Sequence, residues 1–294
     1  MRRQPNKVWA KNRPGALPIP GDRSVSAFTK PNVLERWTEQ AAGVRALEQG
    51  DAVITMFDVI GEDFWTGGGV TAKKVAAQLR AIGDRPVEVQ INSPGGDMFE
   101  GIAIYNVLRE HSQDVTVKVV GMAASAASII AMAGDRIEVG AAAFIMIHNC
   151  WVLAIGNRHD MAETADWLEP FDVAMADVYA ARTGQPKADI QKWMDSETFM
   201  SGSVALERGF ADALLPSDQT VEDADARAKA AKVNDLRATE LTLVQSGLTR
   251  SEARARINKI KGTPGAASTT PTPGAGNVDW AQVASANLAM FSAA

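Results

Sequence analysis

The sequence predicts an α/β fold around a mostly parallel sheet, because strand-like and helix-like segments alternate along its central part. Short apolar segments typical of strands lie at residues 52–57, 87–92, 115–120, 136–139 and 144–147. Thr71 lies between the first and second of these segments, and Asp97 lies between the second and third. Each is placed to cap a helix whose apolar residues recur at helical spacing. Strands joined through helices in this way run parallel, with right-handed crossovers.

Helical segments predominate after residue 158. A long helix is expected at 159–182, with a kink at Pro170, and a shorter one at 188–194. Residues 222–245 combine alanines with charged residues, which predicts a solvated helix that Gly247 ends. The basic helix expected at 249–261 presents either a solvated face or an anchor for an acidic partner.

The composition divides the chain into four parts. Residues 1–50 form an N-terminal arm that is rich in proline, glycine and basic residues up to about residue 32, with a possible short helix at 33–49. Residues 51–216 carry the α/β domain, and residues 217–261 form a charged helical extension. Residues 262–294 combine a flexible Pro/Thr/Gly linker with a short terminal docking segment.

Composition also excludes several classes of function. The net charge of −5 provides no basic surface for nucleic acid. The longest apolar stretch, at 122–133, is too short to cross a membrane, and no secretory signal is present. The single cysteine, Cys150, fits a reducing cytoplasm and is expected to be a buried thiol. No cofactor motif and no set of metal ligands is found, so neither a cofactor nor a metal is expected.

A candidate nucleophile, Ser125, lies in a segment of small residues, GMAASAAS at 121–128. The strand expected at 115–120 ends at Gly121, and the apolar residues that follow continue as a buried helix. A serine in the first turn of such a helix lies near its partly positive N-terminus, and small neighbours let a substrate backbone approach. The same run of small residues is also typical of a helix-packing patch, so the segment alone leaves both interpretations open.

Two further segments favour the interpretation of Ser125 as a catalytic nucleophile. Upstream, a Ser-Pro-Gly-Gly turn follows a strand, and its Gly95 and Gly96 expose backbone N–H groups that could stabilise an oxyanion together with the N–H of Ala126. The backbone from Gly96 through Asp97 to Met98 could pair with an extended peptide. Downstream, His148 follows the strand at 144–147, where an imidazole with a pKa near ~6.5 can act as a general base.

Taken in this order, the Ser-Pro-Gly-Gly, Ala-Ala-Ser and Met-Ile-His segments resemble the Clp protease proteolytic subunit family. The resemblance extends from about residue 53 to residue 215 and includes the segments at 197–201 and 205–212. The sequence of residues 61–69 and 155–160 is more similar to the Clp-like proteases of tailed-phage head-assembly clusters than to the housekeeping enzyme. The resemblance implies a crotonase-like, ClpP-like spiral of ββα units with a long protruding helix, followed here by the helical and partly disordered C-terminal extension.

The resemblance also implies a catalytic triad. Ser125 and His148 match the family's nucleophile and base, while the position of the third member, an aspartate in the family, holds Glu197. A glutamate can orient an imidazole as an aspartate does, with one more methylene of reach. Asp195, two residues earlier, is the alternative third member.

The expected activity is therefore serine endopeptidase chemistry on a peptide or protein substrate. The resemblance implies homo-oligomeric rings, a possible separate ATPase unfoldase, and, for a phage-encoded chain in the host cytoplasm, capsid or scaffold proteins as substrates. Two alternatives are a capsid-assembly scaffold or shell module and a crotonase-fold enzyme acting on acyl-CoA. A Ser–Lys dyad with Lys118 is disfavoured because that lysine precedes the nucleophile on a strand.

Overall fold

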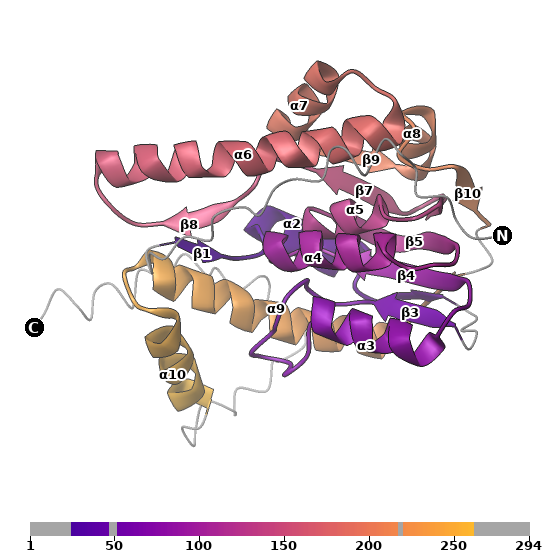
Figure 1. Cartoon of the computed structure of the whole chain (residues 1–294). Helices are drawn as coiled ribbons and strands as arrows, with labels where there is room; N and C mark the ends of the chain where they lie inside the picture. Colours follow the sequence, from indigo (N-terminus) through magenta and orange to yellow (C-terminus); the bar gives the residue numbers. More distant parts are fainter. Residues whose placement is uncertain (1–24, 47–51, 217–219, 262–294) are drawn as a thin grey trace, which may run out of the picture. The chain divides into compact units, whose positions relative to one another are not determined.

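The computed structural model of the chain describes residues 25–46, 52–216 and 220–261. Contacts divide the chain after Gly247 into two units, and α10 (Arg250–Lys261) belongs to the second. The helices of the first unit (Figure 1) are α2 (Pro31–Gln40), α3 (Ala72–Ile82), α4 (Met98–Arg109), α5 (Ala126–Ala131), α6 (Arg158–Thr183), α7 (Lys187–Asp195), α8 (Gly202–Glu207) and α9 (Ala224–Gln245). Its strands are β1 (Val25–Ala27), β2 (Val44–Ala46), β3 (Val53–Met56), β4 (Val87–Ser93), β5 (Val115–Ala124), β6 (Arg136–Gly140), β7 (Phe144–Ile147), β8 (Val152–Ala154), β9 (Thr198–Ser201), β10 (Ala213–Leu215) and β11 (Thr220–Glu222).

The largest sheet of the described residues has seven strands, and most of its pairs are parallel. Five strands follow the order β10-β6-β5-β4-β3, with every neighbouring pair parallel. Strand β7 pairs in parallel with the C-terminal end of β5, and β9 adds to β7 in the antiparallel sense. The predicted α/β fold with a mostly parallel sheet is therefore confirmed.

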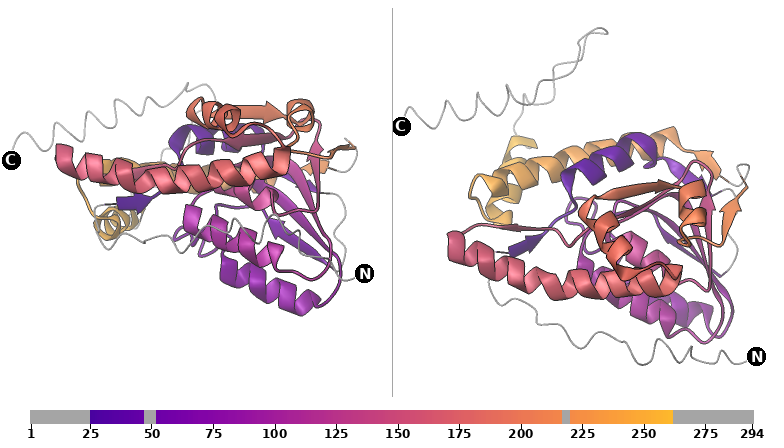
Figure 2. Two further views of the ribbon diagram at one scale, coloured as in Figure 1. Left: turned by 45° about the horizontal axis from the view of Figure 1, so that its top comes forward. Right: turned by 90° about the horizontal axis from the view of Figure 1, so that it is seen from above.

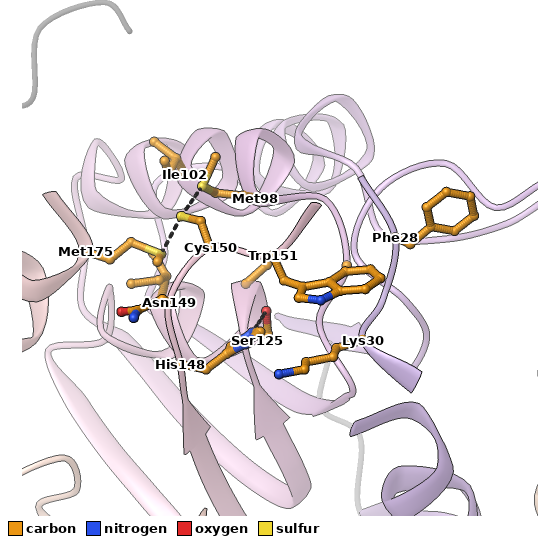
Figure 3. Close-up of a pocket in the computed structure, with 13 residues that line it drawn as sticks. Phe28, Lys30, Met98, Ile102, Ser125, His148, Asn149, Cys150, Trp151 and Met175 are labelled. Atoms are coloured by element: carbon orange, nitrogen blue, oxygen red, sulfur yellow. Dashed lines mark hydrogen bonds between the residues drawn. The ribbon is translucent and has the colours of Figure 1, made fainter. Parts of the chain in front are cut away.

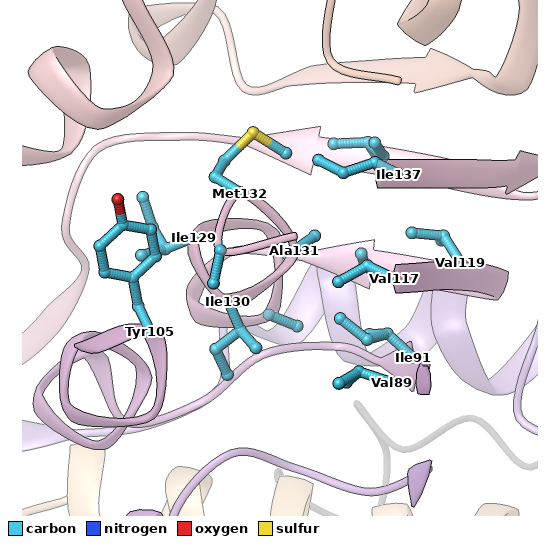
Figure 4. Packing of buried hydrophobic residues seen from close by; sticks show 14 of the residues in the cluster. Val89, Ile91, Tyr105, Val117, Val119, Ile129, Ile130, Ala131, Met132 and Ile137 are labelled. Atoms are coloured by element: carbon cyan, nitrogen blue, oxygen red, sulfur yellow. The ribbon is translucent and has the colours of Figure 1, made fainter. Parts of the chain in front are cut away.

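The main hydrophobic core lies between this sheet and α5, all of whose residues are buried (Figure 4). The same cluster contains fully buried aliphatic side chains from three neighbouring strands, namely Val89, Ile91, Val117, Val119 and Ile137. Full burial of a side chain of this size contributes roughly 1.5–3 kcal/mol to stability. This packing holds α5 against the sheet and so fixes the position of the residue that precedes it.

Strand β5 is longer than the sequence predicts. It passes through Gly121 and continues to Ala124, since its last three residues pair with β7 instead of ending in a turn. Glycine is required at this point because an added Cβ at Gly121 would lie 2.6 Å from the Asn92 side-chain oxygen. That oxygen also accepts hydrogen bonds from the Trp37 indole and the Met122 backbone.

The N-terminal segment differs from the predicted arm. Its described end forms β1, which pairs antiparallel with β8, and the expected helix begins at Pro31 and ends at Gln40. The chain then turns into β2, which pairs with β11. Residues 47–49 of the expected helix, and residues 1–24 of the arm, lie outside the described residues.

Helix α6 is continuous in Figure 2, and Pro170 lies inside it. It ends at Thr183 and is capped by Gly184, whose φ of 70° is left-handed. The sequence predicts that the apolar surface of this helix, which includes Trp167, Leu168, Phe171 and Val178, together with that of the small-residue helix after Ser125, exceeds what one subunit can cover. However, Phe171 is fully buried within the chain, and Trp167 packs against Phe171 and Phe99. The apolar surface that α6 leaves for a partner is therefore smaller than expected.

Helix α9 is not simply a solvated helix, because its Leu241, Val244, Asn234 and Glu240 are buried within the described residues. It packs against α2 and belongs to the same unit as the sheet. The linker and docking segment predicted after residue 261 lie outside the described residues. Among the described helices, none is long and apolar enough to cross a membrane.

Candidate active site

Ser125 occupies the junction between β5 and α5, in a strained backbone conformation. Its φ of 54° and ψ of −125° fall outside the regions that non-glycine residues favour. Its N–H donates to the carbonyl oxygen of Met146 in β7, which fixes the junction to the sheet. The hydroxyl makes no helix-capping hydrogen bond and instead shares a hydrogen bond with the Nε2 atom of His148, with 2.7 Å between the two atoms.

His148 lies directly after β7 and is 5% exposed. Burial of the imidazole, together with the nearby charge of Lys30, lowers the pKa of His148 to about 4, although the charge of Glu197 acts in the opposite direction. The ring is therefore neutral at neutral pH, and an unprotonated Nε2 can accept the Ser125 proton. This value is well below the ordinary histidine pKa near ~6.5 that the sequence suggests.

The glycine turn, residues 93–97, lies against Ser125. A Cβ at Gly95 would lie 2.7 Å from the Ser125 Cβ and 3.1 Å from the Ala126 nitrogen, so only glycine permits this approach. The Gly95 N–H donates to the Ser93 hydroxyl, whereas the Ile60 backbone bonds the Gly95 carbonyl and the Asp97 N–H. In such a parallel pairing the N–H of the intervening Gly96 points away from Ile60.

Asp97 keeps an extended backbone, but its N–H donates to the Ile60 carbonyl and its own carbonyl accepts from the Gly101 N–H. Asp97 is the N-cap of α4, where its carboxylate accepts hydrogen bonds from the Phe99 and Glu100 N–H groups. Met98 is the first residue of that helix. The stretch that the sequence suggests for strand pairing with a substrate is therefore reduced to Gly96, because the backbone groups of Asp97 are already paired and α4 begins at Met98.

A pocket opens beside Ser125 and His148 (Figure 3). Apart from these two residues, its lining consists of Phe28, Lys30, Gly96, Met98, Ile102, Ala126, Ile129, Asn149, Cys150, Trp151 and Met175. Most of this wall is apolar. The Cys150 sulfur lies 2.8 Å from the Met98 sulfur, and burial raises the thiol pKa, so Cys150 is an apolar wall residue and not a competing nucleophile.

Glu197 and Asp195 take different partners. The Glu197 carboxylate pairs with the Lys30 ammonium and accepts a 3.2 Å hydrogen bond from the Asn32 amide; the Lys30 contact is the main reason why the Glu197 pKa lies below its ordinary value. Asp195 accepts a 2.8 Å hydrogen bond from the Asn149 amide. Among the described contacts, neither carboxylate is hydrogen-bonded to the His148 ring, although the Glu197 charge acts on that ring.

Sequence reasoning missed Lys30, which lines the pocket and pairs with Glu197. Nothing in its spacing from residue 197 signals the contact, since 167 residues separate the two. The only local signal is the helix start Pro31 that follows it. The lysine weighed in the sequence, Lys118, instead pairs with Glu88 on the neighbouring strand and takes no part in the site.

Comparisons with known proteins match the part of the chain that contains this site. A family model described as Clp protease matches residues 68–218, which include Ser125, His148 and Glu197. The chain is also 32% identical over 158 residues to the ATP-dependent Clp protease proteolytic subunit of Deinococcus radiodurans. That alignment covers 52% of this chain and 76% of the relative. Helix α9 lies beyond the segment that the family model matches.

Proposed function

The chain belongs to the Clp protease family and is a serine-type endopeptidase, and from this premise we propose that Ser125 and His148 carry its chemistry. The observation that supports these roles is the 2.7 Å contact between the Ser125 hydroxyl and the His148 ring beside an apolar pocket. As the Ser125 Oγ attacks the scissile carbonyl carbon, its proton passes to His148 Nε2. The imidazolium then protonates the leaving amine, and water hydrolyses the acyl-enzyme with His148 again as base.

The oxyanion of the tetrahedral intermediate is proposed to bind the N–H groups of Gly96 and Ala126. Ala126 is the first residue of α5, where a helical N–H has no partner inside the helix. Gly95 is the weaker candidate of the three, because its N–H already bonds the Ser93 hydroxyl. Loss of one such donor typically lowers the rate by about 10²–10³-fold.

The third member of the triad is proposed to be Glu197, which acts once its carboxylate leaves Lys30 and turns toward the imidazole. Its charge already favours protonation of His148, and it belongs to the segment that matches the family. Asp195 is the less favoured alternative because it bonds the Asn149 amide, and the carboxylate charge that acts on the His148 ring is that of Glu197.

Glu197→Gln is therefore expected to lower kcat by about 10²-fold, which is less than the ~10⁴-fold loss typical of a fully engaged carboxylate. The substitution removes the charge that stabilises the imidazolium. Asp195→Asn serves as the matched control and should lower kcat by less than about threefold. Steady-state hydrolysis of a fluorogenic peptide measures both. A larger loss in Asp195→Asn would assign the third role to Asp195.

The pH profile provides a second test. With a His148 pKa of about 4, the base is unprotonated above that value, so kcat/KM should stay nearly flat from pH 8 to about 5 and fall below it. Lys30→Met removes a positive charge that lowers this pKa, so the pKa should rise and the acidic limb should move to higher pH. At pH 5 the variant should therefore retain a smaller share of its pH 8 rate than the wild type does.

The control for this experiment is Lys192→Met, because Lys192 is 73% exposed and pairs with Asp189 at the surface. Its profile should match the wild type. An unchanged acidic limb in Lys30→Met would show that Lys30 does not act on the base.

The proposed substrates are flexible peptides or proteins with apolar side chains that fit the pocket wall, and the proposed assembly is the ring of the family, in the cytoplasm. Residues 61–69 and 155–160 support a narrower proposal, namely processing of phage capsid or scaffold proteins.

A fluorophosphonate probe, followed by peptide mapping, tests the chemistry: labelling should occur at Ser125 and disappear in His148→Ala. Incubation of the full chain with co-encoded capsid and scaffold proteins tests the substrate, and an absence of cleavage would reject head maturation.

A further inference from the structure

Helix α9 is connected to the catalytic site through the loop at residues 58–70. The segment that matches the family, residues 68–218, contains only the end of this loop. Loop 58–70 lies between α9 and the glycine turn. On one side, the Ile60 N–H donates to the Gly95 carbonyl and the Ile60 carbonyl accepts from the Asp97 N–H, both at 2.9 Å. A Cβ at Gly96 would lie 2.2 Å from the Ile60 oxygen, so the two backbones are in direct contact.

On its other side, loop 58–70 is held by one arginine of α9. The guanidinium of Arg237 lies 2.7 Å from an Asp58 oxygen and 2.9 Å from an Asp63 oxygen. A further N–H of Arg237 donates to the other Asp63 oxygen at 3.4 Å. The two carboxylates lie on either side of Ile60 in sequence, so Arg237 ties both ends of the segment that contacts the glycine turn.

This ion pair is largely buried, so its charges are screened less than those of a surface pair. The side chains of Arg237 and Asp63 are 11% and 7% exposed, and Asp58 is 28% exposed. Burial raises the pKa of Asp63, but hydrogen bonds from Arg237 and Thr66 outweigh it and leave the pKa below its ordinary value. A planar guanidinium that binds two carboxylates fixes their relative positions in a way that a point charge cannot.

A second contact from α9 supports the same loop one helical turn later. The Trp65 indole N–H donates to a Glu240 carboxylate oxygen at 2.7 Å, and Glu240 is 3% exposed. Arg237 itself is oriented by the Asn234 amide oxygen at 2.5 Å. Loop 58–70 is thus held at several points by a helix of the C-terminal extension.

We propose that Arg237 is a positioning residue for the oxyanion hole. By joining Asp58 to Asp63, it fixes Ile60, and through the Ile60 backbone it holds the glycine turn so that the Gly96 N–H faces the reacting carbonyl. This role rests on the proposed serine peptidase chemistry. Because a small displacement of an oxyanion donor weakens binding of the transition state more than of the substrate, its loss should appear in kcat and not in KM.

The test compares Arg237→Gln and Arg237→Lys in the full chain. We expect Arg237→Gln to lower kcat by about 10-fold to 10²-fold with KM nearly unchanged, and to weaken binding of a peptide boronic acid, which forms a tetrahedral adduct, by a similar factor. Arg237→Lys should retain more of the kcat and bind the boronic acid more tightly than Arg237→Gln does. The matched control is Arg182→Gln, which removes another partly buried arginine–aspartate pair, with Asp212, away from the glycine turn.

Amide hydrogen exchange of the peptide covering residues 93–98 provides a readout that does not need activity. Exchange there should speed up in Arg237→Gln and not in Arg182→Gln. Unchanged exchange, an unchanged kcat, or an equal loss of kcat in both variants would overturn the proposal. If Arg237→Gln does not fold, Asp58→Asn is judged by the same criteria. A wild type that neither reacts with the serine probe nor cleaves peptides would reject the proposed chemistry, while the exchange result would still decide whether Arg237 positions the turn.

Discussion

Ser125→Ala is expected to abolish peptide hydrolysis, with a loss of kcat of about 10⁶-fold, the order typical for removal of a serine nucleophile. The change deletes one oxygen, and the hydroxyl it removes makes no helix-capping hydrogen bond, so the fold and the assembly should remain. Alanine does not relieve the positive φ at this position, which is held by the hydrogen bond to Met146 and the packing of α5. Peptidase assays and probe labelling measure the loss, and thermal unfolding checks the fold.

The neighbouring Ser128 provides the matched control for this substitution. Its hydroxyl lies 2.7 Å from the Tyr179 hydroxyl and donates to the Ser125 carbonyl, so Ser128→Ala should lower the unfolding temperature but keep Ser125 reactive toward the probe. Labelling at another residue, or undiminished cleavage by Ser125→Ala, would reject Ser125 as the nucleophile.

His148→Ala is expected to cause a loss of nearly the same size, because a serine hydroxyl without a base is a weak nucleophile. Nucleophile and base act as one unit, so the double variant Ser125→Ala/His148→Ala should be hardly less active than either single variant. The residual rate should also lose the acidic limb of the pH profile. Additive losses in the double variant would mean that the two side chains act independently, which contradicts the proposed proton transfer.

Much of the fold could be predicted from the sequence, because strands such as 144–147 are short, apolar and bounded by breakers. The predicted strand matches β7 residue for residue. The end of β5 was predicted wrongly at Gly121, since glycine usually marks a turn and only the three-dimensional contact with Asn92 explains it inside a strand. The prediction that α9 is a solvated helix was incomplete for a similar reason. Its buried residues contact elements, such as α2, that lie far away in the sequence.

The candidate site could be predicted where motifs are local. The glycine turn, Ser125 and His148 each lie at the end of a strand of one sheet, so parallel pairing brings them together. Lys30 and Arg237 could not be predicted, because each reaches its partners through side chains across more than 160 residues of sequence. The partner of Glu197 was also beyond sequence reasoning, because Lys30 lies 167 residues away in the sequence.

The ion pairs and hydrogen bonds between α9 and loop 58–70 determine where the chain can be divided for expression. A fragment that stops near residue 216, at the end of the segment shared with relatives, would lack Arg237 and leave Asp58 and Asp63 close together without their counter-ion. Without the guanidinium the two carboxylates repel each other, and the helix that packs against α2 is lost, so both effects destabilise the fragment. A soluble, active fragment should therefore extend at least to Gly247, where the first unit ends.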